Sequence, residues 1–257
     1  MSIITLFLTP IPSRARAAAI FVLSVFLLPV IPARAFPAGA RGDDDFIRSR
    51  REMVERDLRR RGIKEPAVLG AMESVPRHLF VGEKERPFAY EDHPLPIGEG
   101  QTISQPYIVA LMTELAQLKG DEKVLEVGTG SGYQAAVLSR LAREVYTIEI
   151  LPALAAKAKR TLAQLGYGNV QIKTGDGFFG WEDKGPFDVI LVTAAAEEIP
   201  ERLWQQLRDG GRLVMPLGGR QNQKLVRATR LGAKREVEEI TGVVFVPMTG
   251  AIREKGR

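Results

Sequence analysis

The sequence predicts an α/β fold with a doubly wound, mostly parallel sheet. The first observation is the stretch K-V-L-E-V-G-T-G-S-G-Y at residues 123–133, where a short apolar run breaks into alternate glycines and a helical pattern follows at once. Strand, glycine turn and helix in this order open a nucleotide-binding βαβ unit. The second observation is that apolar runs and helical patterns alternate along the rest of the chain, which is typical of a parallel sheet. Further strands are expected at residues 145–148, 170–173, 187–193, 212–216, 225–230 and 243–246.

Length and composition limit the kinds of site that the chain can build. With 257 residues and 45% hydrophobic residues, it is long enough for one large domain with extensions. It has no cysteine, which excludes disulfides, thiolate metal sites and cysteine nucleophiles. Its two histidines, His78 and His93, are too few for a histidine-rich zinc site. We therefore expect no metal site.

Residues 1–35 form a segment that we expect to lie outside the folded domain. Arg14 and Arg16 precede an apolar run at residues 17–28, and Ala33-Arg34-Ala35 supplies a small-x-small cleavage pattern. These features indicate a secretory signal peptide, with an uncleaved anchor and a mis-assigned start codon as the alternatives. Residues 36–45 are expected to be a flexible linker.

The folded part is expected to comprise two regions, residues 46–110 and residues 111–257. The first holds N-terminal helices and a substrate loop: a helix over residues 46–61 that stops at Gly62, a second helix from Pro66, a loop over residues 90–100 and a helix that starts at Pro106. The second is the nucleotide-binding α/β domain.

The net charge of +5 does not indicate a nucleic-acid partner. Three arginines and no acidic residue lie in residues 1–35, which leaves +2 for the remainder. There, basic and acidic residues are mixed, as on an ordinary solvated surface. We expect the folded domain to bind neither nucleic acid nor a membrane.

The spacing of the glycines predicts the kind of nucleotide. Gly128, Gly130 and Gly132 read G-x-G-x-G, and Tyr133 stands where a dinucleotide site needs a third small residue. With Glu126 in front, the pattern E-x-G-x-G-x-G resembles motif I of the class I S-adenosylmethionine-dependent methyltransferases. The alternative is a tight turn that binds no ligand.

Other polar residues follow the ends of later strands, where a doubly wound sheet binds its ligand. Glu149 ends the second strand, about 20 residues after the glycines, and is expected to hold a ribose hydroxyl, unless it is a surface glutamate. Asp176 lies between two glycines and either accepts a hydrogen bond from an adenine amine or forms an Asp-Gly turn. Thr193 ends the fourth strand.

Several longer motifs resemble the protein-L-isoaspartate O-methyltransferases, over about residues 45–250. The most specific is the loop G-x-G-Q-T-I-S-Q-P at residues 98–106. The others are R-H-L-F-V at 77–81, L-P-I-G at 95–98, V-L-E-V-G-T-G-S-G-Y at 124–133, G-D-G at 175–177, P-F-D at 186–188, V-T-A-A at 192–195 and F-V-P at 245–247.

The resemblance implies a class I methyltransferase fold of the Rossmann-like type and S-adenosyl-L-methionine as methyl donor. The methyl group is expected to pass to the α-carboxylate of L-isoaspartyl residues in damaged proteins, which is a repair reaction. Ser104 is implied as the catalytic residue that binds the substrate carboxylate, with Thr102 and Thr193 as further substrate-binding residues. The cofactor-binding residues are expected to be Glu126, Gly128, Gly130, Gly132, Glu149, Asp176 and Gly177.

Ser104 also has a structural interpretation, because it lies just ahead of Pro106 and can cap the helix there. Competing functions are a methyltransferase for a small molecule or RNA, a non-catalytic adenosyl-binding module and, least favoured, a nicotinamide oxidoreductase. We expect a monomer. The family is cytoplasmic and the cofactor is made in the cytosol, so a cytoplasmic enzyme is favoured over export to the periplasm through residues 1–35.

Overall fold

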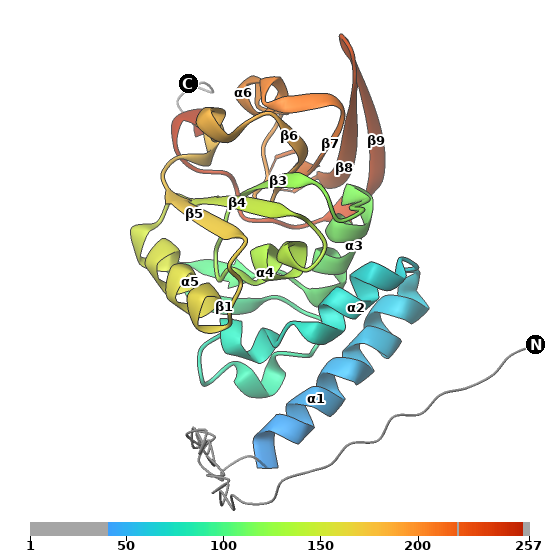
Figure 1. Ribbon diagram of the computed structural model, residues 1–257, viewed down its shortest axis with the longest axis vertical. Helices are drawn as coiled ribbons and strands as arrows, with labels where there is room; N and C mark the ends of the chain where they lie inside the picture. The colour runs from blue at the N-terminus through green and yellow to red at the C-terminus, as the bar shows by residue number, and fades with distance from the viewer. Residues whose placement is uncertain (1–40, 220, 254–257) are drawn as a thin grey trace, which may run out of the picture. The chain divides into compact units, whose positions relative to one another are not determined.

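A computed structural model describes residues 41–219 and 221–253. Its main sheet has seven strands in the order β5-β4-β3-β6-β7-β8-β9 (Figure 1). Strands β3 to β7 pair in parallel, whereas β8 and β9 are antiparallel to their neighbours. The strands are β3 (Lys123–Val127), β4 (Glu144–Glu149), β5 (Val170–Thr174), β6 (Phe187–Val192), β7 (Leu207–Leu217), β8 (Gln223–Leu231) and β9 (Lys234–Val243).

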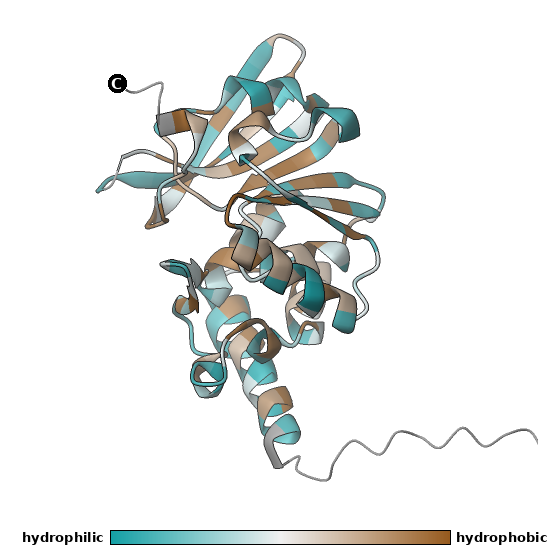
Figure 2. Cartoon of the chain, turned by 90° about the vertical axis from the view of Figure 1, so that its left-hand side faces the viewer, coloured by the Kyte–Doolittle hydropathy of each residue, from teal (hydrophilic) through white to brown (hydrophobic). Residues whose placement is uncertain are grey.

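The sheet is covered on both faces, so the predicted doubly wound fold is confirmed. Alternate residues of each central strand point to opposite faces. In β3, Val124 packs in the cluster formed with α3, α4, α5 and the N-terminal helices, whereas Leu125 packs in the cluster formed with α6 and the short turns. Figure 2 shows hydrophobic residues in the central strands and, mixed with hydrophilic ones, in the helices. The helices are α3 (Pro106–Ala116), α4 (Tyr133–Ser139), α5 (Pro152–Gln164) and α6 (Glu201–Gln205).

The N-terminal helices are present, but the first begins earlier than predicted. Helix α1 (Arg41–Met53) continues through a π-helical turn, η1 (Val54–Leu58), and a 3-10 turn, η2 (Arg59–Arg61), before Gly62 ends it with a φ of 103°. The last five residues of the expected linker are therefore helical, because Asp43 and Asp44 lie in the first helical turn, where acidic side chains favour the helix dipole. Helix α2 (Pro66–Ser74) follows as predicted. Residues 1–40, with the rest of that linker and the signal-like segment, lie outside the described residues.

The stretch expected to be a loop before Gly100 contains a strand. β1 (Leu95–Gly98) and β2 (Gln101–Ile103) form a small antiparallel hairpin. The prediction was wrong because Pro and Gly hid a strand whose Leu95 and Ile97 are buried. Three consecutive residues with positive φ make the turn: Gly98 (99°), Glu99 (52°) and Gly100 (70°).

The last strands also differ from the prediction. β7 begins at Leu207 and includes the two glycines that were expected to precede it. β9 ends at Val243, where the sequence predicted a strand to begin. Most residues of β9 are exposed and show no apolar alternation, so its pairing with β8, rather than any local pattern, makes it a strand. Residues 244–246, which were expected to complete a strand, leave the sheet.

No helix among the described residues is long and apolar enough to cross a lipid bilayer. Short 3-10 turns connect the helices and strands. The turns are η3 (Arg77–Phe80), η4 (Arg86–Phe88), η5 (Gly177–Phe179), η6 (Glu182–Lys184) and η7 (Ala251–Arg253).

Candidate active site

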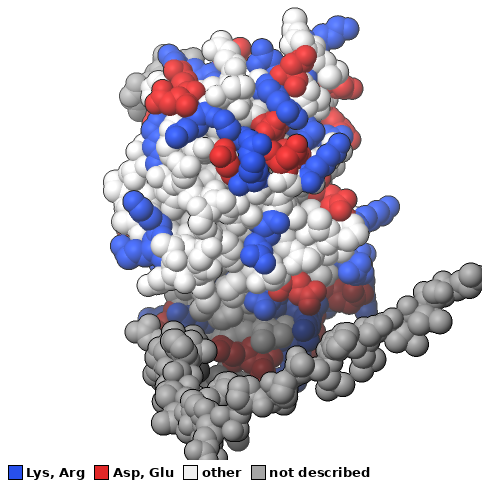
Figure 3. Space-filling model, in the orientation of Figure 1, with Lys and Arg blue, Asp and Glu red and all other residues white. Residues whose placement is uncertain are grey.

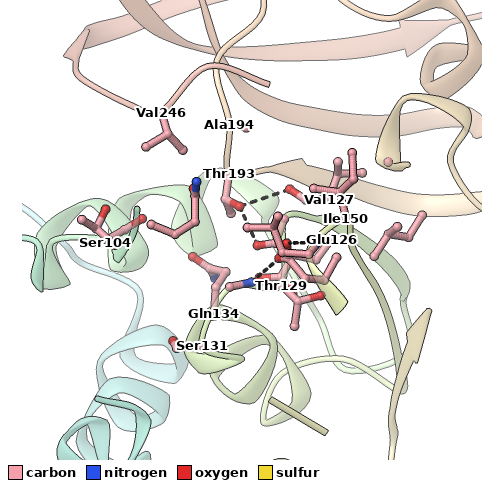
Figure 4. Close-up of a pocket in the computed structure, with 18 of the residues that line it drawn as sticks. Ser104, Glu126, Val127, Thr129, Ser131, Gln134, Ile150, Thr193, Ala194 and Val246 are labelled. Atoms are coloured by element: carbon pink, nitrogen blue, oxygen red, sulfur yellow. Dashed lines mark hydrogen bonds between the residues drawn. The ribbon is translucent and has the colours of Figure 1, made fainter. Parts of the chain in front are cut away.

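A cavity lies at the carboxyl ends of β3, β4 and β6, where the strand order of the sheet reverses (Figure 4). This is the place where doubly wound sheets bind their ligands. Several separate parts of the chain contribute to its wall. They are residues 99 and 101–104 around the β1–β2 hairpin, Val109 in α3, residues 126–131 and 133–134 with the glycine loop, residues 148–151 at the end of β4, Gly177, residues 193–194 after β6, and residues 246–249 near the C-terminus.

The glycine loop approaches the end of β6 too closely for any side chain. A Cβ at Gly128 would lie 2.3 Å from the Oγ1 atom of Thr193, and the φ of Gly128 is 101°. Gly130 also has a positive φ, 53°, and lies in the cavity wall. Position 128 therefore needs glycine and the backbone at position 130 favours it, so at these two positions the backbone itself lines the cavity.

The other two glycines predicted to bind cofactor have packing roles that the structure makes clear. Gly132 is not in the cavity wall; a Cβ there would lie 3.1 Å from Leu162 and 3.3 Å from Ala158, so its absence lets α4 approach α5. Gly177 does line the cavity, and a Cβ there would lie 2.4 Å from the Cγ1 atom of Val127. Cofactor binding by both residues stays a prediction.

Glu149 is 5% exposed and lies in the cavity wall. Its Oε2 atom accepts a hydrogen bond from the Gly130 N–H at 2.7 Å, and Oε1 accepts one from the Leu151 N–H at 3.0 Å. The carboxylate thus ties the glycine loop to the residues after β4. A carboxylate oxygen has more than one lone pair, so both atoms retain the capacity to accept a hydroxyl.

Glu126 is fully buried beneath the same cavity. Its Oε2 atom accepts a hydrogen bond from the Thr147 hydroxyl at 2.6 Å, whereas Oε1 has no hydrogen-bond partner among the described residues. Burial, together with the nearby charge of Glu149, raises the pKa of Glu126 to about 8. A buried oxygen without a partner beside a cavity is suited to a polar or cationic ligand group.

Asp176 lies beside the cavity and not in its wall. Its Oδ1 atom accepts a hydrogen bond from the Phe178 N–H at 2.9 Å, and Oδ2 accepts one from the Ala251 N–H at 2.7 Å. The structure shows Asp176 in a turn, which was one of its two predicted roles: it caps η5 and also binds the backbone of Ala251 near the C-terminus. Its contact with adenine stays a prediction.

The residues predicted to bind substrate lie where the cavity meets a second space. Thr102, Ser104 and Thr193 line the cavity and also a second groove, which we call the acceptor groove. The Thr193 hydroxyl bonds to the Gly128 carbonyl at 2.7 Å, which fixes the end of β6 to the glycine loop. The acceptor groove is lined by Pro94, Thr102, Ser104, Gln105, Ile108, Thr193 and residues 221–224 and 242–246.

Ser104 does not cap α3. The capping position is Gln105, and it supplies no side-chain cap. Asp92 does so instead, because its carboxylate accepts hydrogen bonds from the Tyr107 N–H at 3.0 Å and from the Gln105 amide at 2.7 Å. Within the described part of the chain, the Ser104 hydroxyl has no hydrogen-bond partner. The sequence did not indicate Asp92, because it lies 15 residues from Tyr107.

Two further parts of the cavity wall were missed from the sequence. Glu99 reaches it from the hairpin turn, and residues 246–249 reach it from the far end of the chain. The F-V-P motif at residues 245–247 was the signal available for the second, but it did not indicate a position at the site.

Comparison with known proteins gives the same family over most of the chain. The family model described as "Protein-L-isoaspartate(D-aspartate) O-methyltransferase (PCMT)" matches residues 48–253. Protein-L-isoaspartate O-methyltransferase 2 of Shewanella sediminis is 56% identical over 224 residues, covering 86% of this chain and 91% of the relative. Protein-L-isoaspartate O-methyltransferase of Opitutus terrae is 50% identical over 234 residues, covering 91% and 98%.

Solved structures agree with this result. A protein-L-isoaspartate O-methyltransferase superposes with a TM-score of 0.73 at 30% identity, covering 79% of this chain and 67% of that one. A putative protein-L-isoaspartate O-methyltransferase of Plasmodium falciparum, solved in complex with S-adenosyl-L-homocysteine, gives a TM-score of 0.69 at 26% identity, covering 78% and 98%. The chain described here belongs to the protein-L-isoaspartate(D-aspartate) O-methyltransferase family.

Proposed function

We propose that this chain transfers a methyl group from S-adenosyl-L-methionine to the α-carboxylate of L-isoaspartyl residues in damaged proteins. The observation that carries the proposal is the family match, which spans residues 48–253 and includes every residue of the cavity wall. The cavity also fits the cofactor. The backbone of Gly128 and Gly130 lines the cavity, and the Oε1 atom of Glu126 has no hydrogen-bond partner among the described residues.

Cofactor binding is assigned to the wall between the glycine loop and β4. We assign the ribose hydroxyls to Glu149, whose oxygens lie at the end of β4 and retain acceptor capacity. The backbone at Gly128 and Gly130 permits close approach of the rest of the molecule. Glu126 places its Oε1 atom, which has no hydrogen-bond partner among the described residues, below the loop. When bound, the cofactor supplies an electrophilic methyl group on a positively charged sulfur.

Substrate binding is assigned to the acceptor groove. A carboxylate with a pKa of about 4 is ionised at neutral pH, so the chain needs no general base to activate it. Ser104 can donate its free hydroxyl to that carboxylate, and Thr102 and Thr193 border the same opening. The task of these residues is to orient the substrate oxygen toward the cofactor cavity and to exclude water, which favours a transfer that neutralises opposite charges.

The test is an assay with labelled S-adenosylmethionine and two peptides that differ only in an isoaspartyl or an aspartyl residue. We expect label in the isoaspartyl peptide alone, in a base-labile ester. Label in RNA or a small molecule, or cofactor binding without transfer to either peptide, would contradict the proposal.

We further infer that the enzyme acts as a cytoplasmic monomer without a nucleic-acid partner. The cytoplasmic location is supported by the synthesis of S-adenosylmethionine in the cytosol. On the face shown in Figure 3, basic and acidic side chains are interspersed, as on an ordinary solvated surface that binds no nucleic acid. Cell fractionation with N-terminal sequencing tests the location, since a periplasmic protein that starts at Phe36 would overturn it. Light scattering tests the oligomeric state, because a monomer has the molar mass of a single chain.

A further inference from the structure

One short segment lines both the cofactor cavity and the acceptor groove. We call residues 244–248 the wall segment. Its first part, Val244 to Val246, lines the acceptor groove, and its second part, Val246 to Met248, lines the cofactor cavity. Figure 4 shows Val246 on this segment above Thr193 and Ser104. The position of the wall segment therefore determines the shape of both spaces at the point where they meet.

The wall segment lies beyond the sheet, so the regular β-ladder does not hold it. Strand β9 ends at Val243, whose ladder partner is Gln223. On the cofactor side, Ala195 holds the segment: its N–H donates to the Val246 carbonyl at 2.9 Å, and its carbonyl accepts from the Met248 N–H at 2.8 Å. Val244 and Phe245, which line the acceptor groove but not the cavity, do not take part in this pair.

The Gln223 side chain holds Phe245. Its Oε1 atom accepts a hydrogen bond from the Phe245 N–H at 2.6 Å, and its Nε2 donates to the Phe245 carbonyl at 3.1 Å. Gln223 is 6% exposed and is itself in the wall of the acceptor groove. One amide thus satisfies both backbone groups of Phe245, as the next pair of a ladder would have done.

We propose that Gln223 is a positioning residue for the methyl acceptor. By fixing Phe245, it sets the acceptor side of the wall segment opposite Ser104 and Thr193, while Ala195 independently sets the cofactor side. The inference rests on the proposed function, because the groove receives the acceptor only if transfer occurs at Ser104. It predicts that loss of the Gln223 amide impairs use of the isoaspartyl peptide and leaves cofactor binding intact.

Gln206 provides a matched control. It is 7% exposed, its Oε1 accepts from the Trp181 N–H at 2.7 Å, and its Nε2 donates to the Phe179 carbonyl at 2.8 Å. This is the same kind of double contact to the backbone, but Gln206 lines neither the cavity nor the acceptor groove. Gln223→Met and Gln206→Met each keep the side-chain length and remove both hydrogen bonds.

The experiment measures three quantities for the full-length chain and both variants: the midpoint of thermal unfolding, the Kd for S-adenosylmethionine, and kcat and KM for an isoaspartyl peptide. We expect both variants to lose a similar amount of stability. A shift of about 1 Å at a reacting geometry can cost on the order of 100-fold, so Gln223→Met should lose at least about tenfold in kcat/KM for the peptide. The Kd of Gln223→Met for S-adenosylmethionine should stay within about twofold of the parent value. In Gln206→Met, both this Kd and the kcat/KM for the peptide should stay within about twofold of the parent values.

Equal kcat/KM in the two variants would overturn the proposal, and so would a parallel loss of cofactor affinity in Gln223→Met. If Gln223→Met does not fold, Gln223→Asn serves instead, because it keeps the amide but is one methylene too short to reach both groups of Phe245. An unchanged kcat/KM for a folded Gln223→Asn would equally overturn the proposal. Failure of the proposed function is distinct, since the unaltered chain would then not methylate the isoaspartyl peptide.

Discussion

At the scale of single residues, the sequence left two possible roles for Ser104, capping of α3 and binding of the methyl acceptor. The structure assigns the first of these roles to another residue. Asp92 satisfies the first turn of the helix, and the Ser104 hydroxyl is left without a partner among the described residues, at the junction of the cavity and the acceptor groove. Capping and acceptor binding can therefore be tested on different residues.

We predict that Ser104→Ala lowers turnover of an isoaspartyl peptide by roughly 100-fold, because the substrate carboxylate would lose the hydroxyl that we propose orients it. Cofactor affinity and thermal stability should stay near those of the parent chain, since Ser104 caps nothing. Asp92→Ala is the control, and it should cost about 0.5–2 kcal/mol of stability with a smaller effect on turnover per folded molecule. Undiminished turnover by a folded Ser104→Ala variant would remove Ser104 from the catalytic site.

The raised pKa of Glu126 implies that the stability of the folded chain depends on pH. Because burial raises its pKa to about 8 in the folded chain, it stays protonated where the unfolded chain has already released that proton. The unfolded state then binds fewer protons than the folded state between about pH 4.5 and pH 8, so this residue makes the free energy of unfolding fall as pH rises through that window.

We predict that Glu126→Gln removes this contribution. Denaturant titrations at several pH values between 5 and 8.5 should show the variant gaining stability relative to the parent chain by at most about 1.4 kcal/mol per pH unit. The difference should become constant above about pH 8. Parallel curves for the two proteins across the whole range would show that Glu126 titrates normally.

At the scale of elements, the glycine loop and the end of β6 form one unit. The loop needs glycine at position 128 for two reasons, its φ of 101° and the 2.3 Å that would separate a Cβ from the Thr193 Oγ1 atom. The Thr193 hydroxyl in turn bonds to the Gly128 carbonyl. The turn between β3 and α4 is thus shaped by a strand that follows almost 60 residues later in the sequence.

Gly62 allows the two reasons to be separated, because its φ is 103° and a Cβ added there would meet no atom of the described residues within 4 Å. We predict that Gly62→Ala costs about 1–2 kcal/mol from backbone strain alone, and that Gly128→Ala costs more and also weakens cofactor binding. Adding Thr193→Ala to Gly128→Ala should recover part of the excess, as expected for residues in contact. Losses in the double variant that equal the sum of those in Gly128→Ala and Thr193→Ala would contradict the proposed clash. Denaturant unfolding measures the parent chain, the three single variants and the double variant.

At the scale of the whole molecule, the folded unit accounts for the family match without the first 35 residues. The described helices and strands lie between Arg41 and Arg253, and the family match begins at residue 48. Removing residues 1–35 also removes three arginines, which lowers the net charge from +5 to +2.

We predict that a chain starting at Phe36 folds with an unfolding midpoint close to that of the full-length protein. Its kcat/KM for an isoaspartyl peptide should agree within about twofold, because the cavity wall lies entirely within residues 99–249. Thermal unfolding and the peptide assay measure both quantities side by side. A shortened chain that folds but has lost activity would show that residues 1–35 contribute to the site.

The sequence by itself determined the fold class and the location of the site. Both follow from local patterns: the glycine run after β3, the acidic residue at the end of β4 and the alternation of strands and helices depend on neighbours in the chain. The helix at Pro106 was predictable for the same reason, since proline suits the first position of a helix.

Only the tertiary structure decided which atoms of these residues are free to act. Asp176 accepts a hydrogen bond from the Ala251 N–H, and Gly132 packs against α5. The wall segment is held by a hydrogen bond to Gln223. Each of these partners is distant in the sequence. β9 is a strand because β8 supplies its hydrogen bonds, although its own residues carry no strand pattern. Burial, hydrogen-bond satisfaction and pairing depend on groups that folding brings together, and no local pattern records them.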